Sequence, residues 1–230
     1  MIILTGDTHR NFKRVISFTK KHKTTRDDIL IILGDVGINY HGRIDDTPFK
    51  HHLNKLPITL LCIHGNHEMR PETIPEYREV EWNSGIVYME PKYPFLLFAK
   101  DGEIYNLNGK QCIAIGGAYS IDKPLRLING QNWWDDEQPS EEIKQRVEQK
   151  LEDVGWSVDA VFSHTTPEKY EPREKFMDGI EKSKIDKSTE KWLDSIEDRL
   201  TYKKWYCGHY HTNKLINKVQ FLYRDFIELK

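Results

Sequence analysis

Five short polar motifs rich in His, Asp and Asn recur along the chain, each directly after an apolar segment. They are Asp7-Thr8-His9, Gly34-Asp35, Gly65-Asn66-His67-Glu68, Ser163-His164-Thr165 and Gly208-His209-Tyr210-His211. Carboxylate, amide and imidazole groups bind divalent transition metals, and imidazole also transfers protons near neutral pH. One such motif alone is weak evidence, because a His at a strand end usually forms an ordinary loop hydrogen bond. Five in succession favour a shared site.

The apolar segments before these motifs predict the strands that position them. They are Ile2–Gly6, Ile29–Leu33, Ile58–Ile63, Val158–Ser163 and Lys204–Gly208. In the first third they alternate with predicted helices over Phe12–Lys21 and Thr47–Leu56. Strands that are apolar on both faces and alternate with helices predict a sheet covered on both sides. Ligands gather outside the carboxyl ends of such strands, so the five motifs should line one cleft.

The rest of the chain predicts further strands and helices. Antiparallel strands are expected at Gly85–Tyr88, Phe95–Phe98, Glu103–Leu107 and Gln111–Ile115, with a hairpin turn at Asn108-Gly109. A helix is expected from the N-cap Ser140 to about Leu151, and another over Thr189–Leu200. A terminal hairpin is expected from Lys214–Asn217 and Val219–Leu229, and the charged segment 167–187 is a loop or a lid. Because no repeat or linker interrupts the chain, we expect one domain over residues 1–230.

Composition limits the classes of function. The 230 residues are 38% hydrophobic and 30% charged, which is ample for a core beneath a highly charged surface. The 34 Lys+Arg against 36 Asp+Glu give a net charge of −2, which argues against a protein that coats DNA. The same charge balance is compatible with a nucleotide or a nucleic acid end as a substrate.

Three features of the sequence indicate the cellular compartment of the protein. No apolar run approaches the ~18 residues that cross a bilayer. The N-terminal segment reaches Asp7 without the basic region of a signal peptide. Three cysteines (Cys62, Cys112 and Cys207) lie far apart in predicted strands, which fits a reducing compartment better than a disulfide framework. We therefore expect a cytoplasmic protein without a membrane partner; its oligomeric state stays open.

In their order, the five motifs resemble those of the calcineurin-like metallophosphoesterase superfamily. The pattern of that superfamily runs Asp-x-His, Gly-Asp, Gly-Asn-His-Asp/Glu, a lone His and Gly-His-x-His, and it is matched here from Asp7 to His211. The resemblance implies an α/β fold, a four-layer αββα sandwich of two mixed sheets with helices outside. It also implies a metal-dependent phosphoric ester hydrolase.

The resemblance further implies a role for each motif residue. Asp35 would bridge two divalent cations, which such sites hold about 3.5–4 Å apart. The other implied ligands are Asp7, His9 and His211 for one cation, and Asn66, His164 and His209 for the second. Oxygen and imidazole donors suit Mn²⁺, the most expected metal, and also Fe, Zn²⁺ or Co²⁺. The nucleophile would be a hydroxide that bridges the metals.

The residues after Asn66 have implied roles other than metal binding. His67 would be the catalytic proton donor or charge stabiliser at the leaving oxygen rather than a ligand. Glu68 would orient that histidine or its loop.

Two departures from the superfamily bear on the substrate. Its protein serine/threonine phosphatases follow Gly-Asp with an aspartate-arginine pair, where this chain has Val36 to Asn39, and they carry an arginine at the position of His64. Arginine is the bidentate partner of a doubly charged phosphate. Its absence favours a phosphodiester or another small phosphoester as the substrate.

Three other functions are alternatives to a phosphodiesterase. A phosphomonoesterase acting on proteins or nucleotides is the first, and a nuclease acting on nucleic acid ends is weakened by the lack of a basic stretch. A non-catalytic binding scaffold is the third, and the intact motifs argue against it.

Other residues are candidates for contact with the substrate. Arg10, Asn39 and Tyr210 adjoin the motifs. Arg10 and Arg126 could meet a phosphate, although a surface ion pair is the simpler interpretation for each. Trp133 and Trp134 could stack on a nucleobase, but apolar anchoring of their loop is favoured.

Overall fold

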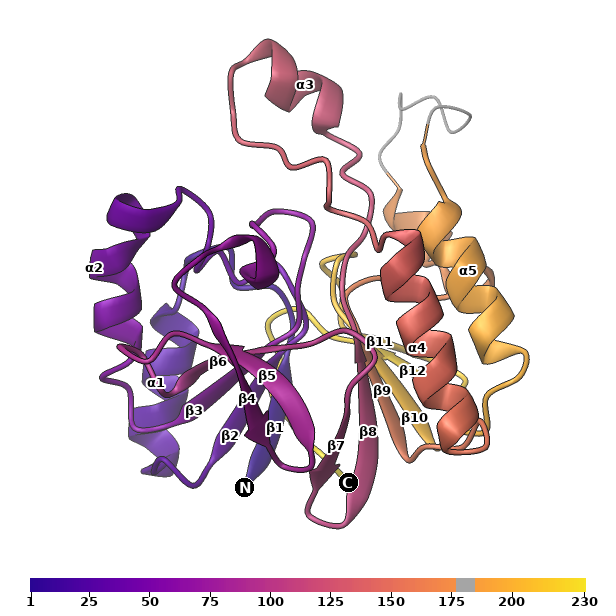
Figure 1. The fold of residues 1–230 in the computed structure, drawn as a ribbon, viewed down its shortest axis with the longest axis horizontal. Coiled ribbons are helices and arrows are strands. Elements are labelled where there is room, and N and C mark those ends of the chain that lie inside the picture. The colour runs from indigo at the N-terminus through magenta and orange to yellow at the C-terminus, as the bar shows by residue number, and fades with distance from the viewer. Residues whose placement is uncertain (177–184) are drawn as a thin grey trace.

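The apolar segments form two β-sheets that pack face to face, with helices on the outer faces (Figure 1). This computed structural model describes residues 1–176 and 185–230, together with the side chains in these ranges except those of Arg43 and Ile44. The arrangement confirms the predicted αββα sandwich of two mixed sheets. Within the segment predicted as a loop or lid, residues 177–184 lie outside the described residues.

The first sheet has seven strands in the order β13-β1-β2-β3-β6-β5-β4. Their bounds are Ile227–Glu228, Ile2–Thr5, Ile29–Ile32, Thr59–Cys62, Leu96–Ala99, Gly85–Met89 and Arg78–Trp82. The central strands β1, β2, β3 and β6 are parallel, and β13, β5 and β4 run antiparallel to their neighbours. The carboxyl ends of β1, β2 and β3, which carry three of the motifs, therefore lie side by side.

The second sheet has six strands in the order β11-β12-β10-β9-β8-β7. Their bounds are Lys214–Ile216, Val219–Phe221, Lys204–Cys207, Ala160–Ser163, Lys110–Ile115 and Ile104–Leu107. Strands β8, β9, β10 and β12 are parallel, and β7 and β11 form antiparallel edges. The motifs after β9 and β10 thus lie next to each other.

Alternation of side chains along the strands divides the core into layers. In β2, Ile31 packs between the sheets, whereas Leu30 and Ile32 face the helices. Helices α1 (Lys13–His22) and α2 (Arg43–Leu53) cover the first sheet, and α4 (Glu141–Asp153) and α5 (Ser188–Glu197) cover the second (Figure 1). Both faces of the central strands are therefore buried, which accounts for their continuous apolar runs.

Local signals in the sequence are confirmed at two elements. The Ser140 hydroxyl accepts a hydrogen bond from the Ile143 backbone N–H at 3.3 Å and so caps α4. Asn108 and Gly109 both have positive φ, as the two-residue turn between β7 and β8 requires.

Three predictions about individual elements are corrected. The middle strands are not all antiparallel, because β6 and β8 extend the parallel parts of their sheets through β3 and β9. Helix α2 begins a turn before Thr47, where the Asp46 carboxylate accepts hydrogen bonds from the backbone of His41 and Gly42. The segment Val219–Leu229 is not one hairpin arm. Only β12 pairs with β11, and the chain then crosses to place β13 beside β1.

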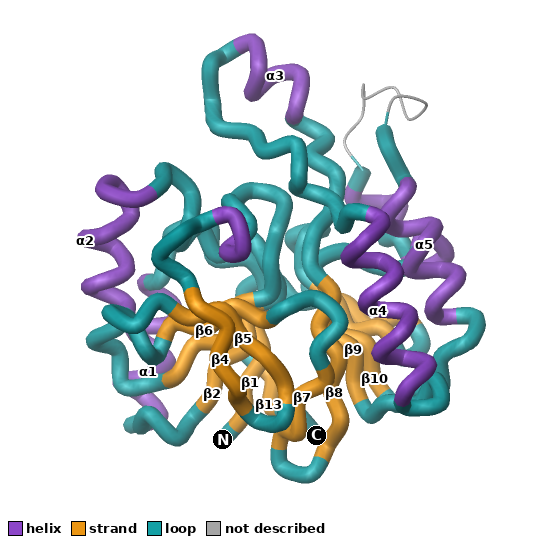
Figure 2. The backbone as a smooth tube through the Cα atoms, viewed as in Figure 1, coloured by secondary structure: helices purple, strands orange, loops and turns teal. Residues whose placement is uncertain are grey.

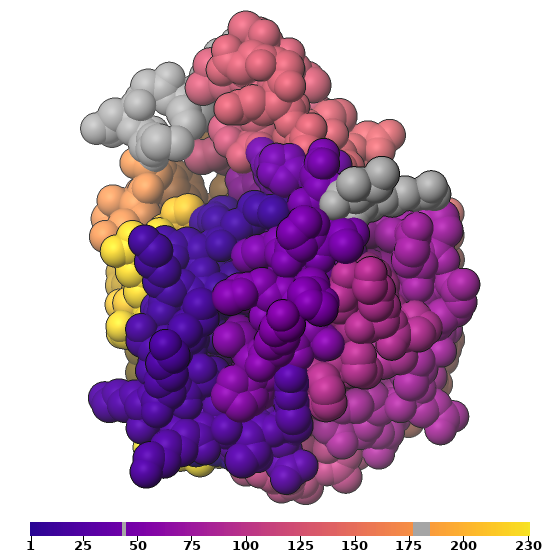
Figure 3. Space-filling model, turned by 90° about the vertical axis from the view of Figure 1, so that its left-hand side faces the viewer, coloured from indigo at the N-terminus to yellow at the C-terminus, as the bar shows by residue number. Residues whose placement is uncertain are grey.

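The elements that were not predicted are strand β4, helix α3 (Lys123–Ile128) and three short 3₁₀ helices at Pro71–Thr73, Glu168–Tyr170 and Arg173–Lys175. Strand β4 is a charged edge strand paired with β5. Helix α3 lies within the predicted long loop and projects from the body of the molecule (Figures 1 and 3). No helix among the described residues is long and apolar enough to span a membrane.

Candidate metal centre

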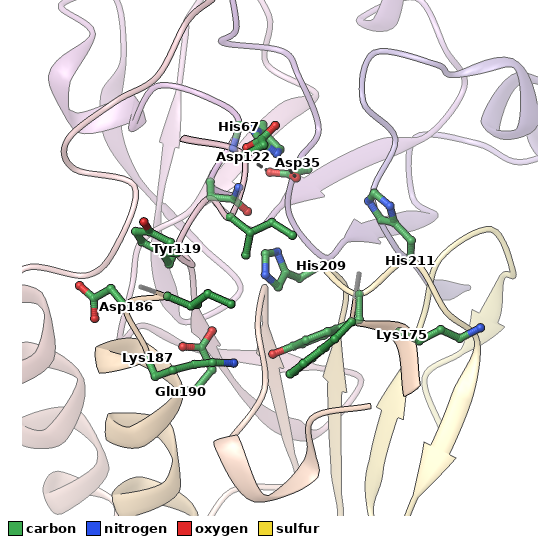
Figure 4. Close-up of a pocket in the computed structure, with 15 residues that line it drawn as sticks. Asp35, His67, Tyr119, Asp122, Lys175, Asp186, Lys187, Glu190, His209 and His211 are labelled. Carbon is green, nitrogen blue, oxygen red and sulfur yellow. Dashed lines mark hydrogen bonds and ion pairs between the residues drawn. The ribbon is translucent and has the colours of Figure 1, made fainter. Parts of the chain in front are cut away.

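The structure brings the five motifs together at one end of the two sheets. Each motif lies in a loop that follows β1, β2, β3, β9 or β10, and these loops gather above the strands (Figure 2). Of the eight motif residues predicted as ligands or catalytic, five line one pocket: Asp35, Asn66, His67, His209 and His211 (Figure 4).

Asp35 lies at the centre of the cluster. Its Oδ2 is 3.8 Å from His9 Nε2 and 3.9 Å from His67 Nε2, and its Oδ1 is 3.5 Å from His164 Nε2. The residue is only 1% exposed. Burial acts to raise the pKa of its carboxyl, but the charges of His164 and His67 bring that pKa below the ordinary value. Asp35 therefore carries a buried negative charge between three imidazoles.

A first group of donor atoms forms around Asp7. Asp7 Oδ2 is 3.1 Å from His211 Nε2 and 3.7 Å from His9 Nε2, and the two imidazole Nε2 atoms are 2.9 Å apart. Burial acts to raise the pKa of Asp7, but the hydrogen bond with His211 and nearby histidine charges hold it below the ordinary value; the same hydrogen bond raises the pKa of His211. Donor atoms of these three residues lie within 4.8 Å of one another, close enough to share a cation.

A second group forms around His164. Asn66 Nδ2 donates to Ser120 Oγ at 2.8 Å, which turns Asn66 Oδ1 toward His164 Nε2, also at 2.8 Å. His164 Nδ1 lies 2.8 Å from the Leu33 carbonyl, which can only accept, so the proton of a neutral ring resides on Nδ1. Nε2 and Asn66 Oδ1 are then two acceptors in contact, an arrangement that a bound metal cation stabilises.

His209 adjoins the second group. Its ring meets the His164 ring edge-on, with centroids 4.9 Å apart. Burial, followed by the charge of His164, lowers the pKa of His209 to about 3, so its imidazole is neutral and has a free lone pair. Asp7, Asp35 and His164 also offer donor atoms within 4.8 Å of one another. The oxygen and imidazole donors therefore fit divalent transition metals.

The backbone is strained where it presents these side chains. His9, Asp35, His209 and His211 all have φ between 42° and 62°, a region that costs energy for residues other than glycine. Close packing beside them also requires glycine. A Cβ at Gly34 would lie 2.0 Å from His164 Nδ1. Such strain clusters at functional sites.

Glu68 holds two of the motif loops together. Its buried carboxylate accepts hydrogen bonds from the backbone N–H groups of Val36 and Gly65 at 3.2 Å and of Gly37 at 2.9 Å. Burial, assisted by the charge of Asp35, raises its pKa to about 8. Glu68 was expected to orient either His67 or the loop, and these hydrogen bonds show that it holds the loop in place.

His67 faces the pocket from the loop after β3. Its Nε2 points toward Asp35, and its buried Nδ1 has no hydrogen-bond partner among the described residues. Burial lowers its pKa, an effect that the charge of Asp35 opposes.

The three predicted substrate-contact residues differ in their placement. Tyr210 lines the pocket, and its hydroxyl lies 3.2 Å from both Thr165 Oγ1 and Glu171 Oε1. Arg10 does not line this pocket, because its guanidinium pairs with Asp46 at 2.5 Å. Asn39 does not line this pocket; it is buried and accepts a hydrogen bond from the Tyr77 hydroxyl at 3.1 Å.

The remaining candidates have structural partners. Arg126 pairs with Asp122 at 2.8 Å, the surface ion pair expected for it. Trp133 Nε1 donates to Glu137 at 2.9 Å, and the Trp134 ring packs edge-on against Tyr40. These contacts fit the anchoring of the loop that carries α3.

The side chains at the positions that lack arginine are buried and do not line the pocket. Val36 and Ile38 are fully buried in the core between the first sheet and its helices. His64 is buried as well, and neither of its ring nitrogens has a hydrogen-bond partner among the described residues. Burial, assisted by the charge of Arg70, lowers its pKa well below the ordinary value.

His64 should make stability depend on pH. In the folded state it stays neutral, whereas in the unfolded state it takes up a proton below about pH 6.5. Its contribution is therefore fully present above that pH and is lost as the pH falls toward the lower folded-state pKa. In denaturant titrations of the metal-free protein, wild type should lose up to ~1.4 kcal/mol per pH unit more than His64→Leu below pH ~6.5. Parallel pH profiles for the two proteins would contradict this account.

The pocket at the centre has a volume of about 440 Å³ and mixes charged with apolar walls. Beside the motif residues it is lined by Tyr119, Ile121, Asp122, Lys175, Phe176, Ile185, Asp186, Lys187, Glu190 and Tyr210. Sequence reasoning did not single out Ser120, which orients Asn66, or Glu190. Neither belongs to a motif, and only the folded chain brings them to the site.

Comparisons with known proteins identify the family. We found no match among curated proteins. Among solved structures 17 chains match. One of them, the protein of unknown function AQ665 from Aquifex aeolicus, is 16% identical, with a TM-score of 0.33 over 73% of this chain and 81% of that one. The profile of the calcineurin-like phosphoesterase family matches residues 1–220, and the chain therefore belongs to that family.

Proposed function

We propose that the chain is a dinuclear metal-dependent phosphoesterase that hydrolyses a phosphodiester or another small phosphoester. The observation that carries the proposal is the position of the Asp35 carboxylate. One of its oxygens faces His9 and the other faces His164, so it lies between the two donor groups. A buried carboxylate in that position can serve both groups at once.

The donor groups define which residues would hold each cation. Asp7, His9 and His211 would hold one, Asn66, His164 and His209 the other, and Asp35 both. Mn²⁺ is the first choice for this mixture of oxygen and imidazole donors, with Fe, Zn²⁺ and Co²⁺ as alternatives. Bound there, the cations would supply Lewis acidity that polarises the phosphoryl group and activates water.

His67 would donate a proton to the leaving oxygen. It lines the pocket and lies beside Asp35, and it is not one of the seven residues that would hold the cations. The charge of Asp35 opposes the lowering of the His67 pKa by burial and so favours the imidazolium, which can give its proton to a developing alkoxide and become neutral imidazole. His67 would therefore act as the general acid.

The small number of basic side chains along the pocket favours a diester substrate over a monoester substrate. Lys175 and Lys187 are the only basic residues other than histidine that line it among the described residues, and Lys187 is paired with Glu171. A monoester dianion carries one more charge than a diester and benefits more from bidentate arginines. With Mn²⁺, kcat/KM for bis-p-nitrophenyl phosphate should equal or exceed that for p-nitrophenyl phosphate.

A phosphoester panel with metal-stripped protein and added Mn²⁺ tests these statements. Metal-dependent turnover would support the phosphoesterase, and absence of turnover with both metal sites filled would favour a binding scaffold. A monoester preference of tenfold or more, ~1.4 kcal/mol in transition-state binding, would overturn the diester preference. If Arg126→Ala removed such a preference, Arg126 would be identified as the substitute for the absent arginines.

A further inference from the structure

Glu190 carries a carboxyl group that the proposed reaction does not use. It lies in the first turn of α5, is 3% exposed and lines the pocket beside His209 and Tyr210. Thr165 Oγ1 donates to Glu190 Oε1 at 2.8 Å, but the buried Oε2 has no hydrogen-bond partner among the described residues. Figure 4 shows the carboxyl group directed into the pocket. An unpaired buried carboxylate oxygen is costly, so a ligand donor would stabilise it.

Aromatic rings form the walls around this carboxylate. Tyr119, Phe176 and Tyr210 all line the pocket, and the Phe176 and Tyr210 rings are nearly parallel, at 16° with centroids 6.4 Å apart. Flat apolar faces of this kind stack well on planar rings. The pocket volume of about 440 Å³ is within the range of roughly 300–1,000 Å³ found for small-molecule sites.

The charges indicate a neutral donor rather than a cationic one. The Lys187 ammonium already lies 4.8 Å from the centre of the Phe176 ring and pairs with Glu171. A second ammonium in the same space would be repelled by it. Burial raises the pKa of the Glu190 carboxyl to about 7, an effect that the hydrogen bond from Thr165 and the charge of Lys187 oppose without cancelling it. An N–H group on a neutral ring would supply the absent donor.

We propose that this pocket is a subsite for the nitrogen heterocycle of a nucleoside phosphoester, with Glu190 as the specificity-determining residue. The heterocycle stacks on the aromatic walls and donates an N–H to Glu190 Oε2, while the phosphoryl group lies toward Asp35 and His209. The inference rests on the proposed function, because the donor groups of that function place the phosphoryl group.

Two substrates that differ by one amino group test the subsite. They are the p-nitrophenyl esters of adenosine 5′-phosphate and of purine riboside 5′-phosphate, which share a leaving group and a ring. Loss of a hydrogen bond to a buried charged acceptor changes kcat/KM by roughly tenfold or more. Wild type should therefore favour the adenosine ester by at least that factor. Equal kcat/KM for the two esters would overturn the proposal.

Glu190→Ala and Glu197→Ala form a matched pair of variants. Both remove a glutamate from α5, but Glu197 bonds to Tyr170 and Tyr202 and does not line the pocket. Glu190→Ala should erase the discrimination, mainly through KM, and Glu197→Ala should retain it. If Glu190→Ala fails to fold, Glu190→Gln replaces the charged acceptor by a neutral amide and should reduce the discrimination at least threefold. Discrimination that survives both Glu190 variants would contradict the assignment.

A second readout separates this inference from the proposed function. Calorimetry with adenosine 5′-phosphate and purine riboside 5′-phosphate measures binding without turnover. Tighter binding of the adenosine compound that depends on Glu190 supports the subsite even if no ester is hydrolysed. Turnover of bis-p-nitrophenyl phosphate together with equal binding of the two nucleotides would retain the phosphoesterase and refute the subsite.

Discussion

Asp35→Asn should lower kcat/KM with Mn²⁺ by about 10³-fold or more, ~4 kcal/mol in transition-state stabilisation. The substitution keeps the size of the side chain and the oxygen that accepts the His67 backbone N–H at 2.9 Å. It removes the negative charge that faces His9 on one side and His164 on the other. Because both donor groups lose their shared anion, binding of both metals should weaken together. Elemental analysis and steady-state kinetics measure the two effects.

Asp159→Asn is the control for this variant. Asp159 precedes β9 at the opposite end of the strand from His164, where it accepts a hydrogen bond from the Gln111 backbone. The same chemical change there should leave metal content and kcat/KM within about twofold of wild type, because surface changes of this kind are small. If Asp35→Asn retained two ions and activity within tenfold, the bridging role of Asp35 would be excluded.

His67→Ala should leave both metals bound and lower kcat by about 10²–10⁴-fold, the usual range for a general acid. His67 lies 3.9 Å from the Asp35 carboxylate but is not one of the seven proposed ligands, so its removal should not open a metal site. The loss should be largest for diesters with an alkyl leaving group. It should shrink for p-nitrophenolate, which needs little protonation.

His41→Ala supplies the matched histidine control. His41 is exposed on the loop before α2, and its ring contacts Tyr40 rather than the donor groups. This variant should behave as wild type on both classes of leaving group. Loss of metal from His67→Ala would make His67 a ligand. An equal loss of kcat for good and poor leaving groups would remove its role as an acid.

The strands and the convergence of the motifs could be predicted because both depend on local patterns. Continuous apolar runs such as Ile29–Leu33 indicate strands buried on both faces, and each run ends at a polar motif. Parallel strands place such ends at the same edge of a sheet, so the grouping of Asp7, Asp35 and Asn66 follows from their positions. His164 and His209 arrive in the same way from the second sheet.

The remaining features depend on contacts between distant segments that have no local signature. The polar contact of Ser120 with Asn66 spans 54 positions, and nothing around Ser120 resembles a motif. Glu190 reads as an ordinary acidic residue in the first turn of a helix, and only the packing of α5 beside Thr165 turns its carboxyl into the pocket. Strand β13 was misassigned because Ile227 and Glu228 extend an apparent hairpin, while the edge of β1 offers their backbone a better partner. The burial of Asn39 beside Tyr77 could not be predicted, because proximity in sequence to Asp35 does not determine which way a side chain points.

The number of Mn²⁺ ions bound per chain tests the central claim most directly. Metal-stripped protein is loaded with Mn²⁺, freed of excess metal and measured by elemental analysis against protein concentration. The two donor groups that share Asp35 predict about two ions per chain. No more than one tightly bound ion under metal-replete conditions would contradict the dinuclear centre.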